Sequence, residues 1–379
     1  MTRPVYAVAT NIVSSLGLDT DAHWSAALAS RSGIRQYEDA SLSENSFYAS
    51  RLDPGAWQCI YAGTRQTTTI PLSPFEQMTL YSAKKALAEI EEPIDLSRTV
   101  LILSSTKGNI EWLNQKEDQR ILLTTSAEII SKELGIPNKP LVISHACISG
   151  VVASIYGLRL LQAGRYEYAV IVGADRFTQF VLSGFQSFKA VDDTPCKPFD
   201  KERRGVTLGE AAATIVLSTR TAHPLAQLVS GATSNDANHI SGPSRTGEEL
   251  ATVINSSLGE AGIKDSQIDL ISAHGTATLY NDEMEAQAFT LSHVANAPIH
   301  SFKGYIGHTL GAAGIVESAM LLSAFRHQQL IPSIGYQLQG VTQPLNITTK
   351  ALPSPILYGL KTGSGFGGCN AATVWKYIC

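Results

Sequence analysis

Residues 141–161 of this 379-residue chain, LVISHACISGVVASIYGLRLL, place a cysteine between a short apolar run and a helical pattern. The run Leu141–Ser144 has the length of a strand, and the residues from about Ile148 onward repeat apolar side chains at helical spacing. Cys147 therefore lies where a strand turns into a helix. Such a cysteine is either a buried small hydrophobic side chain or a nucleophile beside the positive end of a helix, which would lower the pKa of its thiol.

Apolar runs of strand length alternate with helical patterns, and this alternation predicts an α/β layered fold. The strand candidates are Val5–Ala9, Thr99–Ser104, Leu141–Ser144, Tyr168–Val172, Ala212–Ser218, Ile268–Ser272 and Ala372–Tyr377. Capping boxes, in which Ser or Thr is followed three residues later by Glu, predict helix starts at Ser73, Thr125 and Thr246. Gly135 and Gly262 are predicted to end two helices.

Two pairs of segments indicate an internal repeat. GEAAATIVLS at 209–218 resembles GCNAATVWKY at 368–377, and LILSSTKG at 101–108 resembles DLISAHGT at 269–276. The two pairs keep the same order along the chain and have similar separations. A chance match between Ala- and Gly-rich stretches is the alternative.

The segment after Cys147 has a counterpart of its own, TLGAAGIVESAMLL, which follows His308. With the other two pairs, this match predicts two duplicated halves, 1–222 and 223–379. In a duplicated fold, equivalent strand ends lie near a shared pseudo-twofold axis. The repeat therefore predicts that Cys147 and His308 meet there.

The composition sets limits on function. A net charge of −4 gives no indication of nucleic-acid binding, and no run approaches the roughly 18 apolar residues of a membrane helix. Charged residues make up only 16% of the chain, which predicts extensive buried surface. The five cysteines include no CxxC pair, and the N-terminal residues lack the apolar core of a signal peptide. We therefore expect reduced thiols and a cytoplasmic location.

Two further stretches carry residues suited to chemistry. His274 follows a predicted strand in AHGTAT, and Asp282 and Glu285 can order the loop and the helix start beside it. Lys303 and His308 share one Gly-rich loop, and Glu317 on the next helix can pair with Lys303. Each residue alone is as compatible with a structural role as with catalysis.

A glycine-rich stretch, GSGFGGCN at 363–370, precedes the last predicted strand. A β-rich run follows it, where a dinucleotide-binding loop would be followed by a helix. The stretch therefore fits better as a mobile lid or as a source of backbone N–H groups for an oxyanion.

Taken together, these motifs resemble the β-ketoacyl–acyl carrier protein synthases, which are condensing enzymes of the thiolase superfamily. The resemblance rests on "AC-SG" around Cys147, "HGTAT" with a following "ND", "K–GH–GAAG", and "GFGG-N", and it extends to PFDKERRGVTLGEAAA at 198–213 and SNDANH at 234–239. It implies a thiolase-like α/β fold with two duplicated βαβαβαββ-type halves in α-β-α-β-α layers. It also implies a 3-oxoacyl–acyl carrier protein synthase that serves fatty acid, polyketide or polyene synthesis.

The resemblance implies specific roles for the central residues. Cys147 would take up the acyl chain, and the backbone N–H groups of Cys147 and Phe366 would hold the oxyanion. His274 and His308 would stabilise the enolate formed when malonyl–carrier protein loses CO₂. Lys303, paired with Glu317, would hold the histidine loop, and Phe366 would separate the acyl and malonyl stages.

The resemblance also implies what the protein binds. Thr276 and Thr278 would contact the phosphopantetheine arm of an acyl carrier protein, and no bound cofactor or metal is expected. Candidates for docking the acidic carrier protein are Lys201, Arg203 and Arg204, although a solvated loop of mixed charge would look the same. The family forms homodimers or heterodimers with a chain-length factor.

Some features depart from the family pattern and keep alternatives open. His145 stands where the family usually has a hydroxyl residue, and either alters the dimer contact or is a buried, hydrogen-bonded histidine. The region up to about Pro140 is short, which leaves the acyl chain length and the role of Trp112 undetermined. The alternatives are a non-catalytic chain-length factor, a degradative thiolase that uses Cys369 as a second cysteine, and a binding module.

Overall fold

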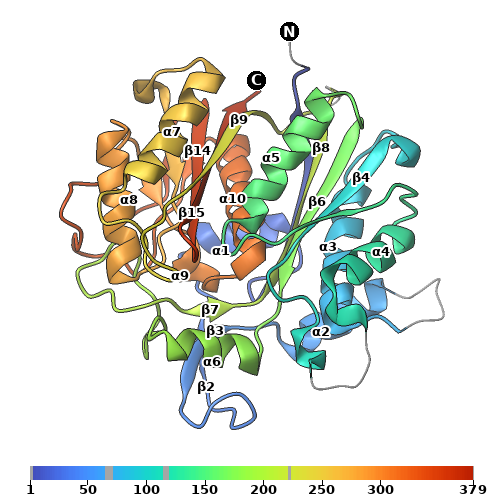
Figure 1. The fold of residues 1–379 in the computed structure, drawn as a ribbon, viewed down its shortest axis with the longest axis horizontal. Coiled ribbons are helices and arrows are strands. Elements are labelled where there is room, and N and C mark those ends of the chain that lie inside the picture. The colour runs from blue at the N-terminus through green and yellow to red at the C-terminus, as the bar shows by residue number, and fades with distance from the viewer. Residues whose placement is uncertain (1–2, 65–70, 114–118, 221–222, 379) are drawn as a thin grey trace.

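The computed structural model describes residues 3–64, 71–113, 119–220 and 223–378, and five layers are visible in it (Figure 1). Helices α3 and α4 cover the outer face of one group of strands, and α7 and α8 cover the outer face of the other group. Helices α5 and α10 lie between the two groups. This arrangement confirms the predicted α/β fold in α-β-α-β-α layers.

The helices and strands have the following bounds. The α-helices are α1 (Thr20–Leu28), α2 (Pro54–Gly63), α3 (Pro74–Ala88), α4 (Leu123–Glu133), α5 (Ser149–Gln162), α6 (Gln179–Ser187), α7 (Glu248–Ala261), α8 (Leu279–Leu291), α9 (Lys303–Ile306) and α10 (Ala313–His327). The strands are β1 (Tyr6–Val13), β2 (Arg35–Tyr37), β3 (Phe47–Ser50), β4 (Thr99–Ser104), β5 (Leu141–Ile143), β6 (Tyr168–Asp175), β7 (Leu208–Gly209), β8 (Ala211–Ser218), β9 (Ala226–Asn235), β10 (Leu270–Ser272), β11 (Ile299–His300), β12 (Gln329–Leu330), β13 (Leu352–Pro353), β14 (Tyr358–Gly365) and β15 (Cys369–Tyr377).

The main sheet contains the same topology twice. Its order is β11-β10-β14-β15-β9-β1-β8-β6-β4-β5. When the five strands of each group are numbered in chain order, their order across the sheet is 3-2-4-5-1. Strands 3, 2 and 4 are parallel neighbours, and strand 5 runs antiparallel to both strand 4 and strand 1. The groups meet where β1 pairs with β9 at Tyr6 and Ala7. This topology matches the repeat read from the sequence. The exact join stays a prediction, since residues 221–222 lie outside the described residues.

The predicted boundaries are partly confirmed. Strand β4 has the predicted bounds, and Ser73 forms the predicted capping box with Glu76 at the start of α3. The capping boxes at Thr125 and Thr246 are wrong. Helix α4 already begins at Leu123, and Gly247 in a left-handed conformation precedes α7, so neither threonine occupies the cap position. Gly262 ends α7 as predicted, in the left-handed conformation that favours glycine.

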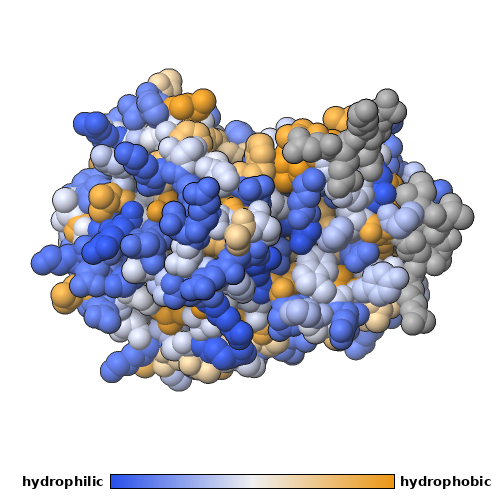
Figure 2. Space-filling view, turned by 90° about the horizontal axis from the view of Figure 1, so that it is seen from below, coloured by the Kyte–Doolittle hydropathy of each residue, from blue (hydrophilic) through white to orange (hydrophobic). Residues whose placement is uncertain are grey.

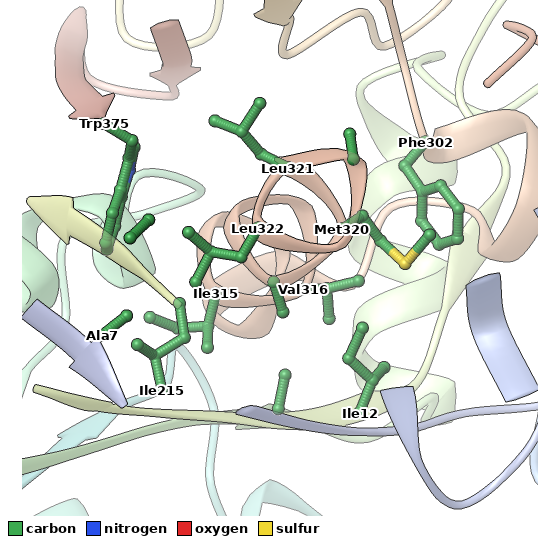
Figure 3. Close-up of a cluster of buried hydrophobic side chains, with 14 of the residues drawn as sticks. Ala7, Ile12, Ile215, Phe302, Ile315, Val316, Met320, Leu321, Leu322 and Trp375 are labelled. Carbon is green, nitrogen blue, oxygen red and sulfur yellow. The ribbon is translucent and has the colours of Figure 1, made fainter. Parts of the chain in front are cut away.

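The core centres on α10, which is buried on all sides from Ala313 to Phe325. Figure 3 shows its side chains pointing outward all round, with Ile315 toward Ile215 and Leu321 on the side of Trp375. Ile12 and Ile215 come from the first group, and Trp375 comes from the second. A helix that is apolar on every face needs burial on every face, and the central layer provides this.

Two glycines bring α5 and α10 into backbone contact. A Cβ atom added to Gly150 would lie 2.8 Å from the backbone nitrogen of Ile315, and one added to Gly314 would lie 2.6 Å from that of Val151. No side chain fits between the helices at these points. The first turns of the two helices are therefore held together, and each turn follows one of the predicted catalytic residues.

The surface seen from below is largely hydrophilic, with apolar residues in small separate groups (Figure 2). Among the described residues, no helix combines the length and the apolar character needed to span a bilayer.

The helix contact can be tested by enlarging Gly314. We expect Gly314→Ala to destabilise the protein by about 1–3 kcal/mol, because the new methyl group overlaps the backbone of α5. Thermal and urea unfolding would measure this change. Gly259→Ala in α7 is the matched control, since a Cβ there meets no atom within 4 Å, and it should be neutral or slightly stabilising. Equal effects of the two substitutions would contradict the tight contact.

Candidate active site

Cys147 lies just before α5, at the junction that the sequence predicts. The hydroxyl of Ser149 accepts a hydrogen bond from the backbone N–H of His145 at 2.7 Å and donates one to the carbonyl of Ala146 at 2.6 Å. Ala146 adopts a left-handed backbone conformation, with φ of 45°. This tight turn directs the chain from β5 into α5 and leaves the buried Cys147 thiol at the wall of a pocket.

His274 and His308 reach the same pocket from the second half of the chain. His274 follows β10, and His308 follows the short helix α9. The Cys147 Sγ and one ring nitrogen of each histidine all lie within 4.8 Å of one another. The two rings are perpendicular, with centroids 5.2 Å apart. The structure thus brings together the three residues that the sequence analysis singled out.

Backbone contacts fix the His308 loop to the first half. The N–H of His308 donates to the carbonyl of Thr207 at 2.7 Å, and the carbonyl of His308 accepts from the N–H of Gly209 at 3.0 Å. Gly307 has a positive φ and lies against this same segment, where a side chain would collide with the backbone of Leu208. The imidazole of His308 is therefore held on a rigid support.

The hydrogen-bond partners of the two rings determine where their protons lie. Nδ1 of His308 accepts from the N–H of Leu310 at 3.3 Å, and Nδ1 of His274 lies 3.3 Å from the Lys303 ammonium, which can only donate. Each neutral ring must then carry its proton on Nε2. The Nε2 of His308 is buried without a partner. The pocket therefore offers N–H donors, which suit an anion and leave no lone pair for a metal.

The electrostatic surroundings favour neutral imidazoles. The pKa of His274 is well below its usual value because of burial, the charge of Lys303, the charge that His308 would carry if protonated, and the charge of Lys361. The pKa of His308 is likewise well below its usual value, because of burial and the charges of the same two lysines. Both rings are therefore uncharged near neutral pH.

The expected low pKa of the nucleophile is wrong. Burial raises the pKa of the Cys147 thiol to about 11, although the charge of Lys303 and the backbone N–H of Phe366 act in the opposite direction. Desolvation of the thiolate outweighs the helix terminus because the sulfur lies inside the pocket. Cys147 is therefore a thiol near neutral pH.

A buried ionic cluster lies behind the histidines. Lys303 donates to the carbonyl of His274 at 2.5 Å and to Glu317 Oε1 at 2.6 Å, as the predicted pairing requires. Lys361 on β14 lies 2.7 Å from the other oxygen, Glu317 Oε2. Burial by itself would favour protonated Glu317, but the two ammonium groups hold its pKa below the usual value. The sequence analysis did not identify Lys361.

Two acidic residues order the His274 loop. Glu285 accepts from the backbone N–H groups of His274 at 2.8 Å and Gly275 at 2.6 Å, which confirms the expected ordering role. Asp282 accepts from the N–H of Phe199 at 2.7 Å and from that of Ala277 at 3.2 Å. Burial raises the pKa of Asp282 to about 7.

The pocket has a size suited to one small ligand. It encloses about 550 Å³, counted out to its open mouth, and Thr276 and Thr278 line it. Their hydroxyl groups lie 2.9 Å apart. Phe366 lines it as well, between Phe185 and Phe188 at ring distances of 5.5 and 5.4 Å. These two phenylalanines were not predicted, and neither carries a motif that would reveal its place.

The predicted docking residues are only partly at the surface. Lys201 and Arg204 are exposed, but Arg203 is 6% exposed and donates to the backbone carbonyls of Asp200, Leu279 and Gly340. Arg203 as a docking residue is therefore wrong, because its guanidinium is occupied by the fold.

The structure also shows where His145, Cys369 and Trp112 lie. His145 lies just after the edge strand β5 and is exposed on this chain, so it is not buried by the chain's own fold. Cys369 is 1% exposed, and its Sγ contacts the carbonyl of Phe366 at 3.4 Å behind the glycine-rich turn, outside the pocket lining. It is not placed as a second catalytic cysteine. Trp112 is also outside this lining and packs on Arg120.

Comparisons with known proteins agree with this geometry. The profile of the β-ketoacyl synthase N-terminal domain matches residues 2–223, and that of the C-terminal domain matches residues 225–337. The chain belongs to the β-ketoacyl synthase family. It is 32% identical over 268 residues to the tetracenomycin polyketide synthase ketoacyl synthase alpha subunit of Streptomyces glaucescens, covering 66% of this chain and 63% of that protein. The chain thus matches somewhat less than two thirds of the length of such polyketide relatives.

A longer match spans nearly the whole chain, and two solved structures share its fold. 3-Oxoacyl-[acyl-carrier-protein] synthase 2 of Mycobacterium leprae is 26% identical over 402 residues, covering 96% of this chain and 95% of that protein. The ishigamide ketosynthase/chain length factor superimposes with a TM-score of 0.89 at 24% identity, over 100% of both chains. A β-ketoacyl synthase from Burkholderia phymatum STM815 gives 0.86 at 24% identity, also over 100% of both chains. These structures share the fold.

The protonation of the histidines can be measured directly. In ¹⁵N-histidine NMR spectra, His274 and His308 should be neutral at pH 6, with the proton on Nε2, because burial and two lysines oppose the imidazolium form. The signal of exposed His293 serves as the internal reference. An imidazolium signal at pH 7, or a proton on Nδ1, would contradict the assigned hydrogen bonds.

Proposed function

We propose that the protein is a 3-oxoacyl–acyl carrier protein synthase, an acyltransferase that condenses malonyl–acyl carrier protein with an acyl chain held on Cys147. The proposal rests chiefly on one observation: a buried thiol and two Nε2–H donors face the same small pocket. Family membership supports the reaction class. The acyl chain would belong to a fatty acid, polyketide or polyene pathway.

In the first step, Cys147 Sγ attacks the carbonyl carbon of an acyl thioester. The oxygen becomes negative and accepts hydrogen bonds from backbone N–H groups at Cys147 and Phe366, since the Phe366 N–H already faces the sulfur. The carbon–sulfur bond to the carrier arm then breaks. The departing arm takes up the thiol proton, so the enzyme is left as an acyl thioester without net change of charge.

In the second step, the malonyl group loses CO₂ and its bonding electrons move onto the thioester oxygen as an enolate. The Nε2–H groups of His274 and His308 donate to this oxygen as its charge develops. The enolate carbon attacks the acyl carbonyl, a carbon–carbon bond forms, and the bond to Cys147 breaks. The released Cys147 thiolate takes up a proton from water, and the chain leaves two carbons longer.

This chemistry requires an acyl carrier protein to bring the substrates. Thr276 and Thr278 would contact the phosphopantetheine arm that carries the substrates, and exposed Lys201 and Arg204 would attract the acidic carrier protein. We propose a homodimer, or a heterodimer with a ketosynthase-like chain-length factor. A reducing cytoplasm would keep the Cys147 thiol free.

The reaction itself is the first test. The protein incubated with malonyl–carrier protein and a panel of acyl–carrier proteins should yield 3-oxoacyl–carrier protein, read by intact mass. Cys147 should carry the acyl group when malonyl–carrier protein is omitted. Neither acylation nor condensed product with any chain in the panel would refute the proposed function.

Two variants separate the steps. Cys147→Ala should abolish acyl loading, while His308→Ala should load within a few-fold of the normal rate but lose roughly 10²–10³ in decarboxylation, as for an oxyanion donor. His293→Asn, at an exposed position, is the control for histidine loss. Loading that persists in Cys147→Ala would overturn the nucleophile, and normal decarboxylation by His308→Ala would overturn the enolate site.

A further inference from the structure

One carboxylate in the core faces two ammonium groups. Glu317 on α10 is 3% exposed, with Lys303 Nζ at 2.6 Å from Oε1 and Lys361 Nζ at 2.7 Å from Oε2. Lys361 is completely buried on β14 and also donates to the carbonyls of Ser272 and Thr362. A buried lysine is costly unless it is paired, and Lys361 is paired with Glu317.

The charge count shows what Lys361 adds. Lys303 and Glu317 alone would form a neutral pair. Lys361 gives this cluster a net charge of +1, directly behind the two imidazoles. The other carboxylate that faces Lys361 is Glu285, whose charge offsets this +1 when it is ionised, and burial raises its pKa. It accepts hydrogen bonds from the N–H groups of His274 and Gly275 and from the hydroxyl of Thr362.

Lys361 also completes a chain of contacts that ends at the pocket. Without it, the second oxygen of Glu317 would be buried without a cation, which would favour the protonated acid. A protonated Glu317 would hold Lys303 only weakly. Lys303 is the group that donates to Nδ1 of His274 and so leaves the proton on Nε2.

We propose that Lys361 is a positioning residue for decarboxylation: it keeps Glu317 ionised, and thereby keeps Lys303 on His274 and the two Nε2–H donors aimed at the substrate oxygen. This inference rests on the proposed function. Lys361 contacts no reacting atom, and it acts through Glu317 and Lys303 together with its own charge.

The titratable groups around Lys361 determine how the decarboxylation rate should depend on pH. Facing Lys361 are Glu317, Lys303, Glu285 and His300. His300 on β11 has its pKa lowered to about 4 by burial and the charge of Lys361, so it is neutral in the assay range. Facing His274 are Lys303, His308 and Lys361. Removing the charge of Lys361 raises the pKa of Glu317, so that Glu317 takes up a proton and releases Lys303 at a higher pH.

Lys361→Met is the primary test, with Lys361→Arg as the variant that keeps the charge. With malonyl–carrier protein alone, Lys361→Met should decarboxylate at least about tenfold more slowly, while acyl loading of Cys147 changes less than about threefold. In a plot of decarboxylation rate against pH, the fall in rate on the acid side should occur at a higher pH than in the unmodified protein. Lys361→Arg should retain more decarboxylation activity and the pH dependence of the unmodified protein.

Several outcomes would overturn the inference. Equal losses in loading and decarboxylation would indicate a purely structural role, and an unchanged rate or pH profile would remove the role altogether. If Lys361→Met does not fold, Lys361→Gln removes the charge but keeps a polar side chain and should show the same shift. In the unmodified protein, the ¹⁵N signal of Lys361 Nζ should be that of an ammonium at pH 7, and a neutral amine would overturn the inference.

This design separates the inference from the proposed function. An unmodified protein that neither loads nor decarboxylates would refute the function itself. An unmodified protein that does both, with Lys361→Met behaving identically, would refute only the role of Lys361.

Discussion

The backbone contact between α5 and α10 is the constraint on which the site depends. Gly150 and Gly314 allow the two central helices to touch, one from each half of the chain. Cys147 precedes the first helix, and His308 precedes the second. Cys147 and His308 come together because two similar halves pack around one central layer. His274 reaches the same pocket from the end of β10 in the second half.

The site works by burial and charge together. Burial makes the thiol hard to ionise and the imidazoles hard to protonate, so the pocket holds neutral groups at rest. The ammonium groups behind it add a positive potential that favours any anion formed there. Charge that develops in the reaction therefore meets donors already in place, which need little reorganisation.

The sequence allowed much of this to be predicted, because motifs report local chemistry. The strand–cysteine–helix junction, the repeat and the capping box at Ser73 depend on neighbouring residues. The pKa of Cys147, the burial of Arg203 and the part played by Lys361 depend on contacts made over long distances. Strand β14, YGLKTGSG, carries a lysine and three glycines and has no apolar alternation, so nothing local indicates that it is buried.

The central claim is that two imidazole N–H groups bind one substrate oxygen beside Cys147. A crystal structure with a malonyl–pantetheine analogue that cannot lose CO₂ tests this most directly. The account predicts the thioester oxygen at about 2.7–3.1 Å from Nε2 of both His274 and His308, with the reactive carbon facing the sulfur. An oxygen held by neither imidazole would contradict it.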